Sequence, residues 1–372
     1  MKNQIILFLF AILFMQGCRD EMNDPVGLDE VPNNIPQPVY IGGIYSDSIS
    51  NFHFESHTGS SQRLWIGKSH SIESRILVRF EVDDSIQFAN ADFAQVKLSV
   101  YGGNPSRGVR VCVFPLTSNW VDTTVEWEKS FSDTQWNNPG GDYDDTDTIT
   151  TLVIREQDED FTFNCDSFSL IDTSFENNKG MIFVYDIGDT LLSIYSKESS
   201  SNPLKLTLFY GDSTKDYLAA SDAFITNSSY IQGNNEFVLG EGYAMRALLI
   251  FNIDTIPPNV TINRAFLTFA FKHEYSYFDS VTINIYRIKG EWDEGDTEFE
   301  PQIEPPNFIV HKEDTVAEVS ITSFVQTWVN EGENYGILLK AKYESSLCSR
   351  LVLDAFHKPT LSVYYTPPPE SE

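Results

Sequence analysis

The chain has 372 residues, of which 41% are hydrophobic and 13% are aromatic. This length suits two domains of ordinary size, and the apolar content is enough for sizeable cores, which excludes wholesale disorder. Lys and Arg number 25 against 54 Asp and Glu, so the formal net charge is −29. Nucleic acids and anionic membrane surfaces both attract basic protein faces, so this charge argues against a general nucleic-acid binder and against electrostatic docking on a membrane.

The first 17 residues have the layout of a secretory signal. Lys2 precedes an uninterrupted apolar run from Ile5 to Met15, which is too short for a stable transmembrane helix. The run ends in Met-Gln-Gly-Cys, which resembles a bacterial lipobox with Cys18 as the lipidated residue, although Met15 stands where leucine is usual. The alternative is an ordinary cleaved signal followed by a chance cysteine.

Residues 18–37 are expected to form a flexible tether because they are rich in Pro, Asn and Asp. The Arg19-Asp20-Glu21 segment resembles the acidic signal that directs some Gram-negative lipoproteins to the cell surface. A lipid anchor acts through its acyl chains, so it is compatible with an acidic body. We therefore expect an outer-membrane, lipid-anchored protein exposed at the cell surface.

The rest of the chain contains one module written twice. Residues 74–101 align without gaps to residues 245–272, and five of the 28 aligned positions are identical. Matching positions continue in order on both sides, among them Trp120 with Trp292. This order predicts two tandem domains, at 38–211 and 216–367, followed by a tail at 368–372.

Each copy is read as short alternating strands separated by clusters of Gly, Pro, Asn, Asp and Ser, which predicts an all-β fold of two β-sandwich (jelly-roll-like) domains. Helical periodicity is confined to residues 321–329, where apolar residues recur at i, i+3, i+4, i+7 and i+8. A short helix there is expected to plug one end of the second sandwich.

These residues resemble the bacterial DNRLRE domains, which are related to carbohydrate-binding module family 96. The marks in the first copy are Gly67, Arg75 to Phe80, the strand ending at Tyr101, the Trp120 to Trp127 segment, Trp136 with the following Gly-Gly-Asp-Tyr, and Pro203 to Tyr210. The marks in the second copy are Gly240, Arg246 to Phe251, the segment from Trp292 to Gly295, the segment from Val325 to Trp328, and Gly336 to Lys340 with Pro359 to Tyr365. The second copy departs from the first after Phe299. The resemblance implies a β-sandwich and glycan binding, but it transfers no ligand residues to this chain.

Aromatic residues in loops or on outward strand positions are the candidate sugar contacts, because the C–H face of a pyranose packs on a π-surface. Residues present in one copy only are the most informative, since residues repeated in both copies are better read as scaffold. Connecting loops and core packing are the alternatives for each of them. The candidates are Tyr275, Tyr277 and Phe278 in one loop, Trp136 and Tyr143 in another, and Trp65 on a strand.

A run of acids offers a candidate calcium site. Asp142, Asp144, Asp145 and Asp147 place four carboxylates within six residues, and calcium prefers several oxygen ligands from a loop. The run lacks the glycine and the distal glutamate of an EF-hand. A solvated acidic loop is the favoured alternative in so acidic a chain.

No catalytic motif emerges. His53 and His57 lack the HExxH order of a zinc helix, and the three cysteines after Cys18 are not a disulfide framework, although a Cys112–Cys165 bridge stays open. The sequence therefore favours a non-catalytic surface lipoprotein that binds carbohydrate through its loops. The alternatives are a structural or adhesion spacer with a protein partner in a surface complex and, with least support, a polysaccharide lyase or hydrolase.

Overall fold

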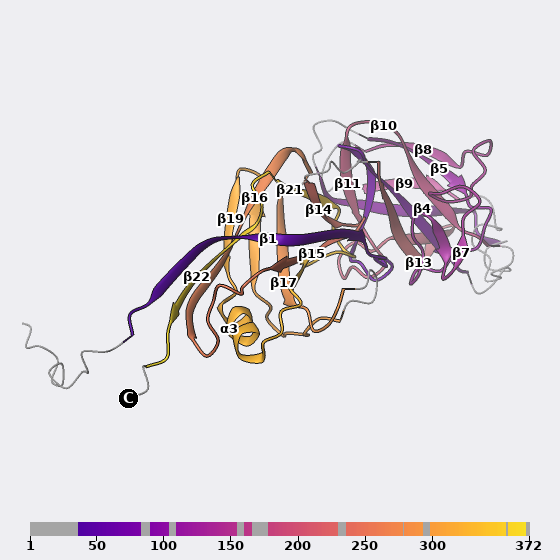
Figure 1. Ribbon diagram of the computed structural model, residues 1–372. Helices are drawn as coiled ribbons and strands as arrows, with labels where there is room; N and C mark the ends of the chain where they lie inside the picture. The colour runs from indigo at the N-terminus through magenta and orange to yellow at the C-terminus, as the bar shows by residue number, and fades with distance from the viewer. Residues whose placement is uncertain are drawn as a thin grey trace, which may run out of the picture.

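The computed structural model describes residues 36–82, 90–103, 109–154, 160–165, 178–229, 236–277, 279–292, 298–354 and 356–369. Within these ranges the chain is almost entirely antiparallel β-structure, arranged as two sandwiches (Figure 1). The all-β fold class is therefore confirmed. The signal at 1–17, Cys18 and most of the tether lie outside the described residues.

Each sandwich is one ten-stranded sheet folded over on itself. The first sandwich consists of β2 (Arg63–Ser69), β3 (Ile72–Phe80), β4 (Phe93–Gly103), β5 (Val109–Pro115), β8 (Thr150–Ile154), β9 (Asp160–Asn164), β10 (Met181–Ile187), β11 (Thr190–Tyr195), β12 (Lys205–Tyr210) and β13 (Ser213–Ser228). A separate small hairpin is formed by β6 (Lys129–Phe131) and β7 (Thr134–Gln135).

The second sandwich repeats this arrangement. Its strands are β1 (Val39–His53), β14 (Glu236–Glu241), β15 (Met245–Phe251), β16 (Thr261–Tyr277), β17 (Ser280–Arg287), β18 (Asn307–His311), β19 (Val316–Ser320), β20 (Ile337–Ala341), β21 (Ser349–Asp354) and β22 (Thr360–Thr366).

The period-two pattern of the sequence accounts for the two cores. Along β4, Ala94, Val96, Leu98 and Val100 are all buried in the first core. The equivalent positions of β16 are Ala265, Leu267, Phe269 and Phe271, which are buried in the second. Burying these alternate side chains is the main favourable term for each sandwich, at about 25 cal/mol per Å² of apolar surface.

The N-terminal strand β1 belongs to the second sandwich. Its first half pairs with β22 and its second half pairs with β15. In the first sandwich β13 plays the same part, since it pairs first with β12 and then with β3. Both strands shift register at the same point, between Ser46 and Ser48 in β1 and between Ala219 and Ser221 in β13. Each bulge lets one strand pass from one layer of its sandwich to the other.

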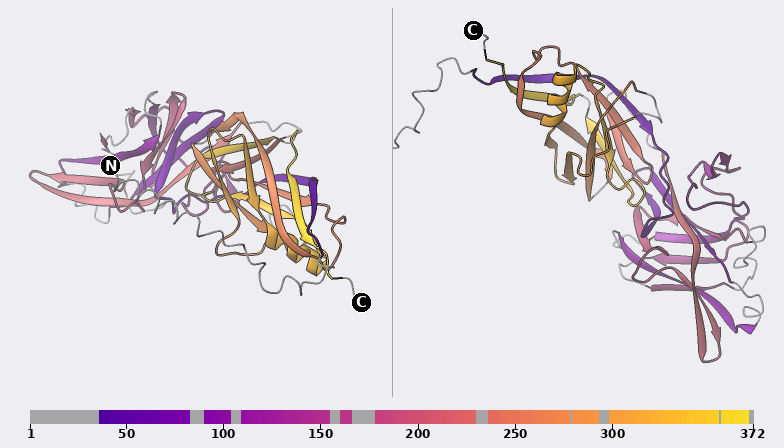
Figure 2. Two further views of the ribbon diagram at one scale, coloured as in Figure 1. Left: turned by 90° about the vertical axis from the view of Figure 1, so that its left-hand side faces the viewer. Right: turned by 90° about the horizontal axis from the view of Figure 1, so that it is seen from below.

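The two domains are therefore not the contiguous stretches 38–211 and 216–367. The segment containing β1 completes the second domain, and the segment containing β13 completes the first. In Figure 1 the indigo β1 runs across the second sandwich and ends beside the first. In both views of Figure 2 the hairpin of β12 and β13 projects from the first sandwich, away from the second.

The predicted helix is present as α3 (Thr322–Glu331), which is somewhat longer than the sequence suggested. It buries Phe324, Val325 and Trp328 against the second core, and it ends at Gly332 with φ of 70°. Glycine adopts this left-handed C-cap conformation without a steric penalty. No disulfide joins the three cysteines that the structure describes, so the Cys112–Cys165 bridge is absent.

Candidate functional site

The two sandwiches meet through a small apolar cluster that includes Ile72, Leu191 and Cys348, with Trp65 packed against it. The indole Nε1–H of Trp65 donates a hydrogen bond of 3.1 Å to the carbonyl oxygen of Ser346 in the second sandwich. Burial raises the pKa of the Cys348 thiol to about 12, which keeps it neutral and unreactive. Three residues of this cluster, Trp65, Leu191 and Cys348, also line a cleft between the two sandwiches.

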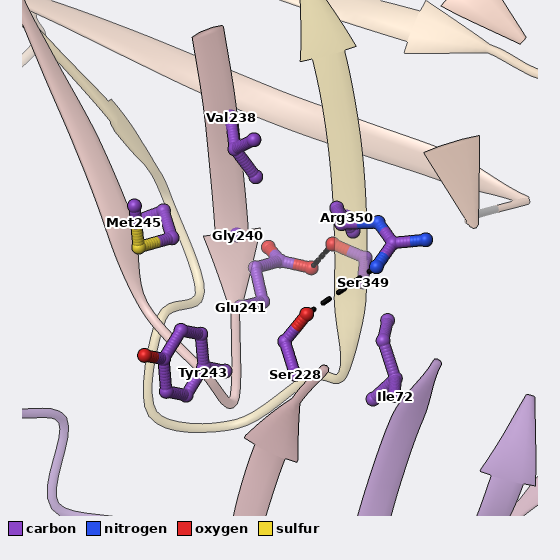
Figure 3. Close-up of a pocket in the computed structure, with 9 residues that line it drawn as sticks. All are labelled: Ile72, Ser228, Val238, Gly240, Glu241, Tyr243, Met245, Ser349 and Arg350. Atoms are coloured by element: carbon purple, nitrogen blue, oxygen red, sulfur yellow. Dashed lines mark hydrogen bonds between the residues drawn. The ribbon is translucent and has the colours of Figure 1, made fainter. Parts of the chain in front are cut away.

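A second contact lies beside the cluster, at the turn between β2 and β3. Arg350, which is 3% exposed, donates from Nη1 to the hydroxyl oxygens of Ser71 (2.8 Å) and Ser228 (3.3 Å). Its Nη2 donates to the carbonyl oxygen of His70 at 2.6 Å. Figure 3 shows Arg350 reaching from its strand to Ser228 of the first sandwich. One buried guanidinium thus joins a turn and a strand of the first sandwich to the second.

The cleft between the sandwiches has a volume of about 660 Å³ and is lined from both sides. The first sandwich contributes Arg63, Trp65 and Tyr101, together with the turns around His70 and Asp189. The second contributes His273, Asp279, Lys312 and the segment from Leu347 to Ser349. These residues lie mainly at strand ends and turns, where a rigid scaffold usually presents binding groups.

The aromatic wall of the cleft is preorganised. The guanidinium carbon of Arg63 lies 3.6 Å from the centroid of the Tyr101 ring, and Arg63 also hydrogen bonds to the phenolic oxygen of Tyr101. Tyr195 packs edge-on against the same ring, with centroids 5.0 Å apart. Each contact restricts the rotamers of Tyr101, so little side-chain entropy is left to lose on binding.

A smaller cavity of about 110 Å³ adjoins the cleft and shares two of its lining residues, Glu241 and Ser349 (Figure 3). Glu241 is 1% exposed and accepts a hydrogen bond of 2.7 Å from the Ser349 hydroxyl, while its Oε1 has no hydrogen-bond partner among the described residues. Burial raises the pKa of Glu241 to about 7, and the neighbouring Glu344 carboxylate adds to the effect. The protonated form is therefore favoured over much of the acidic range.

Two other carboxyls also have raised pKa values. Burial raises the pKa of Asp222, on β13, and the nearby Glu198 contributes. Burial, followed by the charge of Glu55, raises the pKa of Glu126 to about 7. Both residues also retain a buried carboxylate oxygen with no hydrogen-bond partner in the described part of the chain. Buried acids of this kind lower stability when they ionise.

The structure places the predicted aromatic residues in different environments. Trp65 is half-buried and lines the cleft. Trp136 is only 5% exposed and donates its Nε1–H to the carbonyl oxygen of Glu126, so it presents no stacking face. Tyr143 is half-buried and stacks on Phe114 with centroids 5.2 Å apart. The interpretation of this loop as a sugar platform therefore has no support from the packing.

The backbone of Tyr275 and Tyr277 lies in β16, but their side chains and all of Phe278 lie outside the described residues. His273 and Asp279, on either side of this segment, both line the cleft. The three aromatic residues stay candidates on the strength of the sequence.

The predicted calcium loop is organised by its own hydrogen bonds. Asp142 is 5% exposed and accepts backbone N–H donors from Asn137 (3.1 Å) and Asn138 (2.8 Å), together with the Ser118 hydroxyl (2.8 Å). Asp144 accepts from the hydroxyl and backbone N–H of Thr146. Asp145 and Asp147 are exposed.

Within the described residues, which include this whole loop, no group of three or more His, Cys, Asp or Glu is placed to hold a metal ion. That statement also covers His53 and His57. The His53 ring instead stacks on Tyr243, with centroids 4.3 Å apart.

The residues repeated in both copies are scaffold. The Nε1–H of Trp120 donates to the carbonyl oxygen of Lys179 at 2.9 Å, and Trp292 makes the same bond to Tyr335 at 2.7 Å. The repeated arginines each have a carboxylate partner, since Arg75 pairs with Glu73 and Arg246 pairs in a bidentate manner with Glu344. These two tryptophans and two arginines, which are among the marks of the family resemblance, therefore hold the sandwiches together.

Sequence reasoning missed Arg63, Tyr101 and the turn residues of the cleft. Only their combination across two domains forms a site, and the sequence does not place one domain against the other. One available signal was position in the sequence. Arg63 lies two residues before Trp65, and Tyr101 immediately precedes the pair Gly102-Gly103.

A comparison with protein-family models finds no matching family, and a search of curated protein sequences finds no match. The resemblance to DNRLRE domains is thus carried by the quoted residues alone. Among the described residues, no helix has the length and apolar character needed to cross a membrane.

Proposed function

We propose that this chain is a non-catalytic, lipid-anchored protein of the cell surface that binds a carbohydrate chain in the cleft between its two sandwiches. The observation that carries the proposal is the composition of the cleft. Trp65 and Tyr101 supply aromatic surface, and ionic, imidazole and hydroxyl groups surround them within about 660 Å³. That volume is in the range of small-ligand sites, and the mixture of apolar and polar lining suits a sugar.

Binding would combine stacking with hydrogen bonding. The C–H face of a pyranose packs on an aromatic ring, while the hydroxyl groups exchange hydrogen bonds with side chains at the rim. Asp189 and Asp279 accept such bonds, Lys312 donates them, and His70 and His273 do either according to protonation state. The Arg350 contact holds the two walls in register, so the site is largely preformed.

The anchor is proposed on the N-terminal sequence, because Cys18 ends a lipobox-like run. An acylated Cys18 followed by some twenty residues of tether would place the sandwiches outside the membrane without any protein–lipid contact.

Affinity electrophoresis of the protein through gels containing a panel of neutral and acidic polysaccharides tests the proposal. At least one neutral polysaccharide is expected to retard the wild type. Trp65→Ala and Tyr101→Ala are expected to weaken retardation by about tenfold each, which corresponds to 1.4 kcal/mol. Phe356→Ala, at an exposed aromatic far from these two rings in sequence, is the matched control. Absence of retardation by every polysaccharide would remove the proposal.

A structural or adhesion role with a protein partner is the second candidate. It is favoured by the position of β1, which precedes the first sandwich in the chain but pairs with strands of the second. Because β1 crosses the second sandwich, the tether joins the fold at one end of a continuous strand whose other end adjoins the first sandwich. Such an arrangement suits a spacer. If the protein has this role, cross-linking on intact cells should join it to a partner protein. Added polysaccharide should not reduce the yield of that cross-linked product.

A further inference from the structure

The outward face of β1, β22 and β16 carries exposed aromatic side chains. Tyr40 lies opposite Tyr364 on the neighbouring strand, and Tyr364 in turn lies opposite Arg264. Tyr40 is 56% exposed and Tyr364 is 39% exposed, and their ring centroids are 4.6 Å apart. The two rings are tilted by 36° to each other, so these tyrosines offer two adjoining aromatic surfaces to solvent.

The neighbouring rows of this face extend the surface with small hydroxyl groups. Ser362 lies opposite the half-buried Phe266, and Thr360 lies opposite Tyr45 on one side and Thr268 on the other. Tyr45 is 58% exposed. Across β1, β22 and β16 these rows, all within the described residues, contain no Asp or Glu, and on the next strand, β19, the exposed Glu318 lies opposite Thr268. We call the surface formed by Tyr40, Tyr45, Phe266, Thr360, Ser362 and Tyr364 the tyrosine face.

The corresponding face of the first sandwich also carries an aromatic pair. Phe93 on β4 lies opposite Phe209 on β12, with ring centroids 4.3 Å apart, and Phe93 is 40% exposed. The repeat alignment matches Phe209 to Tyr364, and it matches Phe93 to Arg264. An aromatic ring is therefore present on the same strand, at the same outward position, in both sandwiches.

Repeated residues of the scaffold such as Trp120 are buried, whereas Tyr40 and Tyr364 are exposed and give up burial that the core would provide. The exposure of this pair, and not its repetition, points to a ligand. Planar rings beside rows of hydroxyls match a pyranose, whose two faces carry C–H groups and whose edge carries hydroxyls. The net charge of −29 repels polyanions, and Arg264, which lies opposite Tyr364, disfavours a cationic ligand at the ring pair. A neutral sugar chain fits both conditions.

We propose that the tyrosine face binds a neutral polysaccharide chain at a second site, separate from the cleft. This proposal rests on the proposed function, since it extends carbohydrate binding from the cleft to the sheet surface. Two sites on one chain raise the affinity for a long polymer, because the second contact is intramolecular once the first has formed. A polymer is therefore bound more tightly than a short oligosaccharide of the same sugar.

The test uses the full chain with cellohexaose, laminarihexaose, mannohexaose and the corresponding soluble polymers, measured by calorimetry and affinity electrophoresis. For a bound hexaose, the expected stoichiometry is above one per chain. Tyr40→Ser together with Tyr364→Ser is expected to remove one binding event and weaken polymer retardation by about tenfold or more. Tyr364→Phe, which keeps the ring, retains both events, and Phe356→Ser is the control for loss of an exposed aromatic residue.

The outcomes separate the two sites. Loss of all binding in the Trp65 or Tyr101 variants, with the tyrosine face variant unchanged, would leave the cleft in place and refute the tyrosine face. Loss of all binding in the tyrosine face variant alone would support this face and refute the cleft. No binding by wild type would refute both. Thermal unfolding of each variant identifies a purely structural pair: retained sugar binding with a lowered Tm would refute the proposal.

Discussion

Arg350 of β21 donates a hydrogen bond of 2.6 Å to the carbonyl oxygen of His70, in the turn between β2 and β3. His70 and the following Ser71 have φ values of 47° and 67°. The left-handed region disfavours residues with a Cβ, so the turn holds two strained residues in succession. The buried guanidinium bonds to both of them, and the docking of the second sandwich therefore stabilises a turn that its own sequence does not favour.

Replacing Arg350 with Met is expected to lower the free energy of unfolding by about 3 kcal/mol, because the change removes three hydrogen bonds made by a buried, charged donor. Urea unfolding followed by fluorescence measures the loss. Faster amide exchange in the turn at 69–72 is expected to accompany it.

The matched control is Arg110→Met. Arg110 is an exposed arginine paired with Asp186, and its loss should cost at most about 1 kcal/mol. An Arg350 variant no less stable than the Arg110 variant would contradict the assigned role of Arg350.

Asn51 of β1 fastens the exchanged strand to the second sandwich. Its Nδ2 donates to the carbonyl oxygens of Val238 (2.8 Å) and Arg246 (2.5 Å), and its Oδ1 accepts from the Val238 N–H at 2.9 Å. Asn51→Ala is expected to cost about 2–4 kcal/mol, because buried backbone groups of β14 and β15 lose their partners. Hydrogen exchange measured by mass spectrometry should accelerate in these strands and not in β4 or β12.

Ser48→Ala, at an exposed position on the same strand, is the control. If amide exchange in the Asn51→Ala variant accelerated equally in both sandwiches, Asn51 would stabilise the whole molecule and not specifically the pairing of β1 with its neighbouring strands.

Glu241 makes stability depend on pH in a defined direction. Burial raises its pKa from 4.5 to about 7, so the folded state binds a proton that the unfolded chain releases between these values. The stabilisation that protonation provides is complete below pH 4.5 and is lost as the pH rises toward about 7. The shift corresponds to a loss on the order of 3 kcal/mol, at about 1.4 kcal/mol per unit.

Glu241→Gln should flatten this slope, because an amide does not ionise. Urea unfolding at several pH values between 4.5 and 8 compares the variant with wild type and with the exposed Glu318→Gln. Raised pKa values of Asp222 and Glu126 act in the same direction, so wild type and control should both keep a residual slope. Identical slopes in all three proteins would contradict a buried, proton-binding Glu241.

The local elements were predictable because their signals are local. The alternation through Ala94 to Val100 and its match in the second copy follow from burial of every second side chain, and the periodicity at 321–329 predicts α3 for the same reason. The place of β1 was not predictable, since its partners lie near residues 245–251 and 360–365 and no local pattern selects them. Register over such separations depends on the whole sheet.

The residues of the cleft, too, could be predicted only where their signal is local in the sequence. Trp65 was a candidate outward aromatic, with core packing as the favoured alternative, whereas the role of Tyr101 depends on the second sandwich lying opposite it. Trp136 shows the limit of the signal used to select candidates. A residue unique to one copy suggested function, but its loop folds back so that the indole joins a buried cluster and bonds to Glu126. A residue that occurs in only one of the two copies can therefore reflect a difference in packing as readily as a difference in binding.

Asp142 provides the test of the acidic loop. Burial alone would raise its pKa, but hydrogen bonds from the backbone N–H groups of Asn137 and Asn138, and from Ser118, outweigh burial and lower it. The carboxylate thus already has donors for both oxygens, which a calcium ion would have to displace.

Asp142→Ala is expected to lower the free energy of unfolding by about 2–4 kcal/mol, because the N–H groups of Asn137 and Asn138 lose their acceptor. Because a lowered pKa stabilises the fold above the unfolded value, the wild-type advantage should shrink as the pH falls through that range. The loss should be the same in millimolar calcium and in EDTA, as measured by urea unfolding. Stabilisation of the wild type by calcium that Asp142→Ala abolishes would instead establish the loop as a calcium site.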